Sequence, residues 1–78
     1  MTAGQEVTGL ARINGPLVVV EGVIGVGYDD VVDVEGPDGD VRRGRVLEAG
    51  ENLAVIEVFS GTSGLSMGET KVRFKGRP

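Results

Sequence analysis

The sequence predicts an all-β protein, a small six-stranded closed β-barrel in one domain, residues 1–78. Two observations carry this prediction. Of the 78 residues, 14 are glycine and three are proline, and no window repeats apolar residues at helical spacing over three turns. Short valine-rich runs instead alternate with turn residues at the spacing of about 8–12 residues that is typical of small barrels.

The stretch NGPLVVVEG at residues 14–22 organises the predicted barrel. A glycine–proline turn leads into four consecutive apolar residues, and Gly22 ends the run. Such a run is typical of a strand that is covered on both faces. A small protein covers both faces by curling its sheet, and closure removes the edges on which a valine-rich chain would aggregate.

Each of the six expected strands is a short run between turn residues. They span residues 6–14, 17–21, 30–35, 41–49, 53–59 and 71–75. Gly44, inside the fourth strand, indicates a bulge or a barrel corner, with the first half of that strand exposed and the second half buried. Residues 1–5 are expected to be a frayed start.

Two glycine-rich loops carry apolar residues. The loop at 22–28 contains Val23 and Ile24, and we expect it either to cover the end of the core or to press on a neighbouring chain. The loop at 60–68 is expected to be anchored to the barrel end by Leu65 and Met67. The chain closes with Gly-Arg-Pro at 76–78, which suggests a cut linker and hence an excised or engineered domain.

The charges are unevenly distributed along the chain, although the net charge is −4. Arg42, Arg43 and Arg45 form one basic cluster, four more basic residues close the chain, and acidic residues concentrate between 29 and 40. Three interpretations stay open: solvent-facing positions of alternating strands, a face that meets a neighbouring protein, or contacts with phosphates. The acidic net charge and the scarcity of aromatic residues disfavour the third.

No motif supports catalysis, so no catalytic, cofactor-binding or metal-binding residue is assigned. The GLSMG stretch at 64–68 matches the nucleophile-elbow pattern, but the chain contains no histidine to act as general base. The P-loop lysine is missing after Gly68, and the acidic residues at 29–40 lack EF-hand spacing. No run approaches the roughly 20 apolar residues of a membrane span, and no signal peptide is evident.

Three segments together resemble the large head subunits of archaeal-type and vacuolar-type (A/V-type) rotary ATPases. The stretch at 14–22 is similar to the GPL-x-x-V-E-G pattern near the start of both large subunits. Two further segments are similar to the non-catalytic B subunit: GVGY at 25–28 with DGDVRRGRVLE at 38–48, and VFSGTSGL at 58–65 with TKVRFKG at 70–76. The paired arginines and the Val-Arg-Phe sequence favour the B subunit over the catalytic A subunit.

The resemblance implies a six-stranded barrel at the N-terminus of the B subunit. In the family, barrels from alternating A and B subunits form a ring that crowns a hexameric, peripheral, cytoplasmic head engaged in proton- or sodium-coupled ATP synthesis or hydrolysis. We therefore expect a structural domain with no activity or cofactor of its own, neighbouring barrels as partners, and no direct membrane contact. Self-association is expected for the isolated domain, with Val23, Ile24, Arg42, Arg43 and Arg45 as interface candidates.

Two departures from the family pattern stand out. Arg45 occupies a position where the family usually has glutamine, and Ser60 one where it has glutamate or a similar residue. The alternative function is a nucleic-acid-binding barrel of translation-factor type that uses the arginine cluster with Lys71 and Arg73. That alternative requires these five cations to share one continuous face with an aromatic residue, whereas the leading interpretation expects no nucleic-acid partner.

Overall fold

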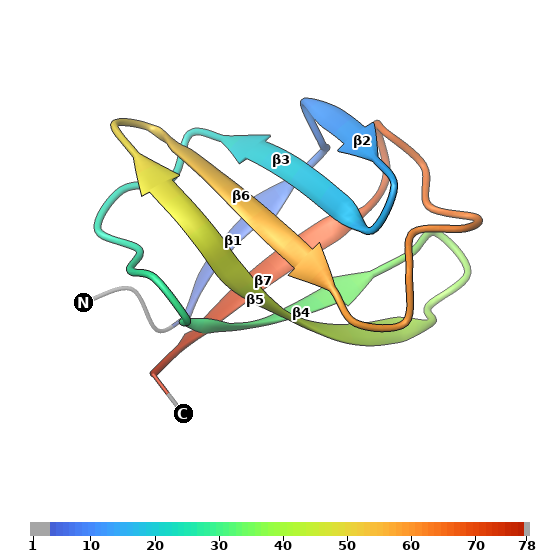
Figure 1. Ribbon diagram of the computed structural model, residues 1–78. Coiled ribbons are helices and arrows are strands. Elements are labelled where there is room, and N and C mark those ends of the chain that lie inside the picture. Colours follow the sequence, from blue (N-terminus) through green and yellow to red (C-terminus); the bar gives the residue numbers. More distant parts are fainter. Residues whose placement is uncertain (1–3, 78) are drawn as a thin grey trace.

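Alternation of apolar and polar residues produces seven strands in the computed structural model, which describes residues 4–77 (Figure 1). The strands are β1 (Gln5–Thr8), β2 (Arg12–Asn14), β3 (Leu17–Glu21), β4 (Val31–Glu35), β5 (Val41–Gly50), β6 (Leu53–Val58) and β7 (Lys71–Gly76). All neighbours pair antiparallel in one sheet, in the order β1-β7-β4-β5-β6-β3-β2. The all-β class is confirmed.

The first predicted strand, residues 6–14, is divided, and this changes the count from six strands to seven within the described residues. Gly9 has φ 101°, a conformation that favours glycine and that ends β1. The Gly9 N–H donates to Thr70 O, beside β7, and the Ala11 N–H donates to Val19 O of β3. The segment therefore leaves one edge of the sheet and joins the other.

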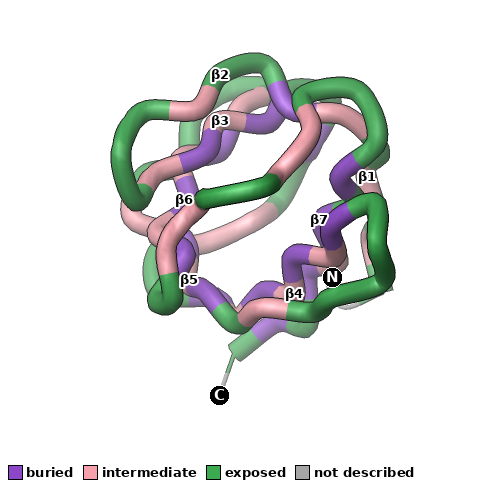
Figure 2. Tube along the Cα trace, turned by 90° about the vertical axis from the view of Figure 1, so that its right-hand side faces the viewer, coloured by how far each residue is buried: buried purple, intermediate pink, exposed green. Residues whose placement is uncertain are grey.

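The two ends of the curled sheet are thus consecutive pieces of chain (Figure 2). Within residues 4–77 no ladder pairs β1 with β2, so closure of the barrel stays a prediction. Part of the predicted frayed start lies outside the described residues, and Gln5 instead begins β1. No helix long and apolar enough to cross a membrane occurs between residues 4 and 77.

The core lies inside the curl, and buried residues alternate with less buried ones along the central strands (Figure 2). This follows from the period of two along a strand, which places alternate side chains on opposite faces. Ala54, Ile56 and Val58 share the buried face of β6, and Val72 and Phe74 share that of β7. The core residues with at most 1% exposure are Val18, Val20, Val23, Val32, Val34, Val46, Ala54, Ile56, Val58, Val72 and Phe74.

Gly44 marks a close approach of strands, and the bulge lies elsewhere in β5. A Cβ at Gly44 would lie 2.4 Å from the Glu57 carbonyl oxygen of β6, so only glycine fits. The register shift occurs between Val46 and Glu48, where Leu47 is the extra residue. The prediction of a buried second half was wrong: Val46 is buried, but residues 48–50, which follow the bulge, are exposed.

The two apolar loops divide between core and surface. Val23 is fully buried and Val26 packs against the core, so the loop at 22–28 does cover the core, whereas Ile24 is 73% exposed. In the second loop Leu65 packs against the core, as predicted. Met67 does not anchor this loop through its side chain, because Met67 is 46% exposed, but its carbonyl oxygen accepts a hydrogen bond from the Leu10 N–H at 2.6 Å. Ser66 and Thr70 hold the turn by further hydrogen bonds.

Candidate functional site

The outward side chains form two surfaces of contrasting chemistry. The charged face consists of outward residues of β1, β4, β5, β6 and β7, together with Asp29 of the preceding loop: Glu6, Asp29, Asp33, Glu35, Arg43, Arg45, Glu57, Arg73 and Lys75. The apolar face consists of Ala11, Arg12, Val19, Glu21, Leu53 and Val55, on β2, β3, β6 and the residue before β2. Both faces follow from the strand period of two, since each lies opposite buried core positions.

Strand register explains the ion pairs of the charged face. Asp33 of β4 lies opposite Arg43 of β5 on one side and Arg73 of β7 on the other. Its carboxylate lies 3.6 Å from Arg43 Nε and 3.7 Å from Lys75 Nζ. Arg73 in turn contacts Glu35 of β4 and lies 3.1 Å from Glu6 of β1. Opposite charges on neighbouring strands therefore neutralise one another within the chain.

Arg45 joins three elements: its own strand β5, the loop before β4, and β6. Its Nη1 lies 3.0 Å from Asp29 in the loop before β4, and its Nε lies 3.2 Å from Glu57 of β6. Asp29 reaches this position from a left-handed backbone, φ 72°. Hydrogen bonds to Asp29 and then Glu57 raise the pKa of the Arg45 guanidinium. The cation is thus held in its charged form by two carboxylates.

Arg42 does not belong to the charged face, although it is adjacent to Arg43 in sequence. Its side chain turns toward the loop at 60–64 and donates to Gly61 O at 2.8 Å and to Ser63 O at 2.5 Å. Its Nε also donates to Asp40 at 3.1 Å, and the side chain is only 16% exposed. The carbonyl contacts give Arg42 the role of fastening the loop between β6 and β7 to β5.

The arginine cluster is therefore split by the pleat of β5, and this bears on the nucleic-acid alternative. Arg43 and Arg45 point outward, whereas Arg42 fastens a loop. Arg43, Arg45 and Arg73 all have carboxylate partners, which would have to be displaced before a phosphate could bind. The single continuous face of five cations that this alternative requires is not formed.

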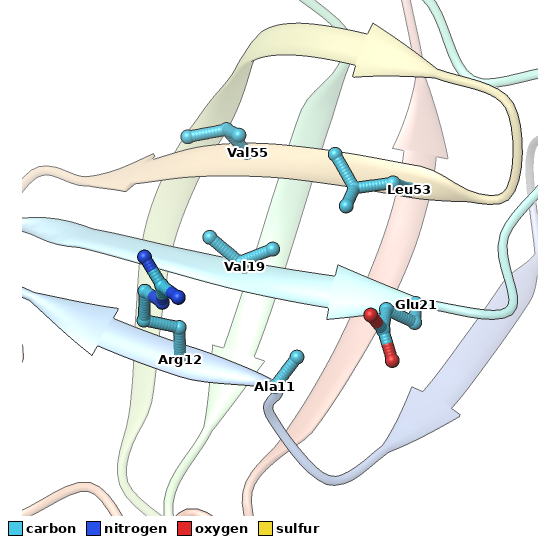
Figure 3. A pocket seen from close by; sticks show the side chains of 6 residues that line it. All are labelled: Ala11, Arg12, Val19, Glu21, Leu53 and Val55. Carbon is cyan, nitrogen blue, oxygen red and sulfur yellow. The ribbon is translucent and has the colours of Figure 1, made fainter.

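The apolar face contains an open groove, about 370 Å³ in volume, that crosses β2, β3 and β6 (Figure 3). Val19, Leu53 and Val55 form its floor, and Arg12 and Glu21 lie at opposite ends. Among residues 4–77, neither Arg12 nor Glu21 forms an ion pair. Sequence reasoning missed this groove, although apolar residues on both faces of residues 17–21 and 53–58 were its signal.

The predicted interface residues of the loop at 22–28 differ in how far they are buried. Val23 is fully buried, so its side chain offers no surface to a partner, while neighbouring Ile24 is 73% exposed. Gln5 holds the loop in place, because its side-chain amide donates to Ile24 O at 3.1 Å and accepts from Ile24 N at 3.3 Å. An interface role for Ile24, Arg42, Arg43 and Arg45 stays a prediction.

The GLSMG stretch forms a turn and not a nucleophile elbow. The Ser66 hydroxyl accepts a hydrogen bond from the Glu69 N–H at 3.2 Å, and the Thr70 hydroxyl accepts one from the Ser66 N–H at 3.1 Å. An elbow needs a strand-to-helix turn, whereas this stretch leads into β7. No group of three or more acidic residues between 4 and 77 is arranged to hold a metal ion.

These features define a small barrel-like β domain in which the distinctive side chains lie on the outer surface of the sheet. The chain belongs to the ATP synthase alpha/beta family, since residues 10–76 match the model of its beta-barrel domain. The resemblance inferred from the three segments is thereby confirmed.

The relatives named as B subunits or beta chains match nearly all of this chain. It is 58% identical over 74 residues to the B subunit of the A-type ATP synthase of Methanopyrus kandleri, and 55% identical over 74 residues to the V-type ATP synthase beta chain of Halothermothrix orenii. It is 54% identical to the B subunit of the A-type ATP synthase of Aeropyrum pernix. Each match covers 95% of this chain but only 8%, 16% and 16% of the respective relative.

Proposed function

We propose that this chain is the N-terminal crown domain of a larger B subunit, in which it acts as a structural, oligomerising module. Its partners are neighbouring barrels of A and B subunits in the cytoplasmic, peripheral head of an A/V-type ATP synthase. There it supports proton- or sodium-coupled ATP synthesis or hydrolysis by holding head subunits together, and it contributes no chemical step itself.

One observation carries this proposal: the chain is 54–58% identical to named B subunits and a named beta chain along 95% of its length, yet spans a small fraction of each. The matched region includes nearly the whole chain, so contacts that the relatives' barrels make can be made here. The outer surface supports the same function, because it offers an ion-paired face and an apolar groove to neighbouring proteins.

A domain replacement tests the proposal. In the B subunit from Methanopyrus kandleri, the corresponding barrel is exchanged for this chain, and assembly with the A subunit of the same organism is measured together with ATP hydrolysis. We expect a head that assembles and hydrolyses ATP. The matched control is the same B subunit with the barrel deleted, which should fail to assemble. A replaced subunit that folds but does not enter the head would refute the proposal.

The isolated chain provides a second measurement. Mixed with ATP and Mg²⁺, it should release phosphate no faster than buffer, because the sequence contains no histidine and lacks the P-loop lysine after Gly68. Turnover above this background that persists through repurification would contradict the assignment of a structural role.

A further inference from the structure

The groove on the apolar face combines an open apolar floor with charged side chains that form no ion pair in the described part of the chain. Its floor is formed by Val19, Leu53 and Val55, and its ends carry opposite charges, Arg12 and Glu21, that have no ion-pair partner among residues 4–77. Four outward cations on the charged face all find carboxylates: Arg43, Arg45, Arg73 and Lys75. Contiguous apolar surface rimmed by polar groups is typical of an interaction site.

Strand register arranges the groove in two rows across the sheet. Arg12 lies opposite Val19, which lies opposite Val55, and these three form the first row. Glu21 lies opposite Leu53, and these two form the second row. Figure 3 shows Arg12 and Glu21 at opposite ends, with Val19 between them.

We propose that this groove is a self-complementary docking surface whose occupant is a second copy of this chain. A two-fold axis that runs across the strands, between the two rows, exchanges one row for the other. It places Val55 on Leu53 of the second copy, and Arg12 beside Glu21 of the second copy. Because the interface is isologous, each contact occurs twice, and both unpaired charges are neutralised.

The contact surface is small, so the dimer is weak. Stable interfaces bury about 800 Å² on each partner, which is more than a groove with six lining residues supplies. We therefore expect a dissociation constant on the order of 0.1–1 mM. This inference rests on the proposed function and deepens it by naming the contact face and the partner of the isolated domain.

Charge reversal tests the pairing directly by sedimentation equilibrium at a chain concentration of about 1 mM. The unchanged chain should show a reversible monomer–dimer equilibrium. Arg12→Glu and Glu21→Arg should each lower the association constant about tenfold or more, since two attractive contacts become repulsive. The double variant Arg12→Glu/Glu21→Arg should recover the dimer, as should an equimolar mixture of the two single variants.

Matched controls change the same charges outside the groove. Lys71→Glu and Glu69→Arg replace exposed residues on β7 and on the loop before it, and both should dimerise like the unchanged chain. Thermal unfolding of every variant verifies that it is folded. A monomer at about 1 mM, single variants that associate normally, controls that weaken association equally, or a mixture without recovery would each overturn the inference.

The domain replacement separates this inference from the proposed function. If the replaced subunit enters the head while the isolated chain stays monomeric, the second-copy dimer is wrong and the structural role stands. If the isolated chain forms the charge-dependent dimer while the replaced subunit fails to enter the head, the structural role is wrong and the dimer stands.

Discussion

The charged face and the apolar face share one pleated sheet, yet their outward side chains differ in where they find partners. On the charged face Asp33 lies between Arg43 and Lys75, and Arg73 contacts both Glu35 and Glu6. On the apolar face Val19 and Val55 lie side by side with no covering element, and the nearby Arg12 has no carboxylate partner in the described part of the chain. The charged side chains of the first face find their partners within residues 4–77, whereas the side chains of the apolar face do not.

This difference separates two roles for strand surfaces. Ion pairs between exposed side chains contribute little stability each, but they keep this face of the sheet charged and hydrated. Apolar residues on an outward face gain free energy only when something covers them. The charged face therefore suits contact with water, and the apolar face suits contact with another protein.

The largest expected effect on stability comes from Gly44, which lies in β5 between Val32 of β4 and Val58 of β6. Gly44→Ala places a methyl group against the Glu57 carbonyl, so the strands must separate. We expect a loss of about 3 kcal/mol in the free energy of unfolding, measured by urea denaturation. Gly50→Ala is the matched control, since nothing lies within 4 Å of its Cβ position. Equal stability of the two variants would show that the fold does not depend on the close approach of β5 and β6 at Gly44.

A smaller effect is expected at Arg42, which leaves the charged face to fasten a loop. Arg42→Ala removes hydrogen bonds to the Gly61 and Ser63 carbonyls and should cost about 2 kcal/mol. Arg43→Ala, the neighbour on the charged face, should change stability by less than about 0.5 kcal/mol because its side chain is 69% exposed. Urea denaturation of both variants measures this contrast. A larger loss of stability for Arg43→Ala would contradict the assignment of Arg42 as the residue that fastens the loop.

The charged face should respond to salt more than to pH. Arg73→Met removes contacts to Glu35 and Glu6, and we expect a lower Tm whose deficit shrinks when about 0.5 M NaCl screens the pairs. Hydrogen bonds to Glu35 and then Glu6 raise the pKa of Arg73. A raised pKa stabilises the fold below the ordinary value and loses this effect only as pH rises through the raised one. Between pH 7 and about 10 the deficit should therefore stay constant.

The smallest effect on stability is expected at Ile24, which tests whether the loop at 22–28 forms part of an interface. Ile24→Ser should change the free energy of unfolding by less than about 0.5 kcal/mol, because the side chain is 73% exposed. In the domain replacement, the same substitution should weaken head assembly if Ile24 meets a neighbouring barrel. Normal assembly would restrict the interface to other surfaces, and Val26→Ser, which disturbs a residue packed on the core, provides the contrasting variant.

The sequence alone predicted most of the strands and which residues of a strand share a face, because the period of two is a local property. Alternation in residues 53–58 is enough to place Ala54, Ile56 and Val58 together, and the core then follows. Family membership could also be predicted, since the similar segments cover most of the chain. The division of residues 6–14 at Gly9 could not be predicted, because a glycine in a strand pattern does not reveal whether its φ will be positive.

Only the tertiary structure decided which charges neutralise one another and which surface remains uncovered. Three arginines within four positions looked like one cluster, but the pleat and the loop at 60–64 separated Arg42 from Arg43 and Arg45. Likewise, residues 17–21 predicted a strand covered on both faces, yet Val19 lies on an open groove. Local pattern determines which side of its own strand a residue takes, whereas its neighbours depend on register between distant segments, which no short window contains.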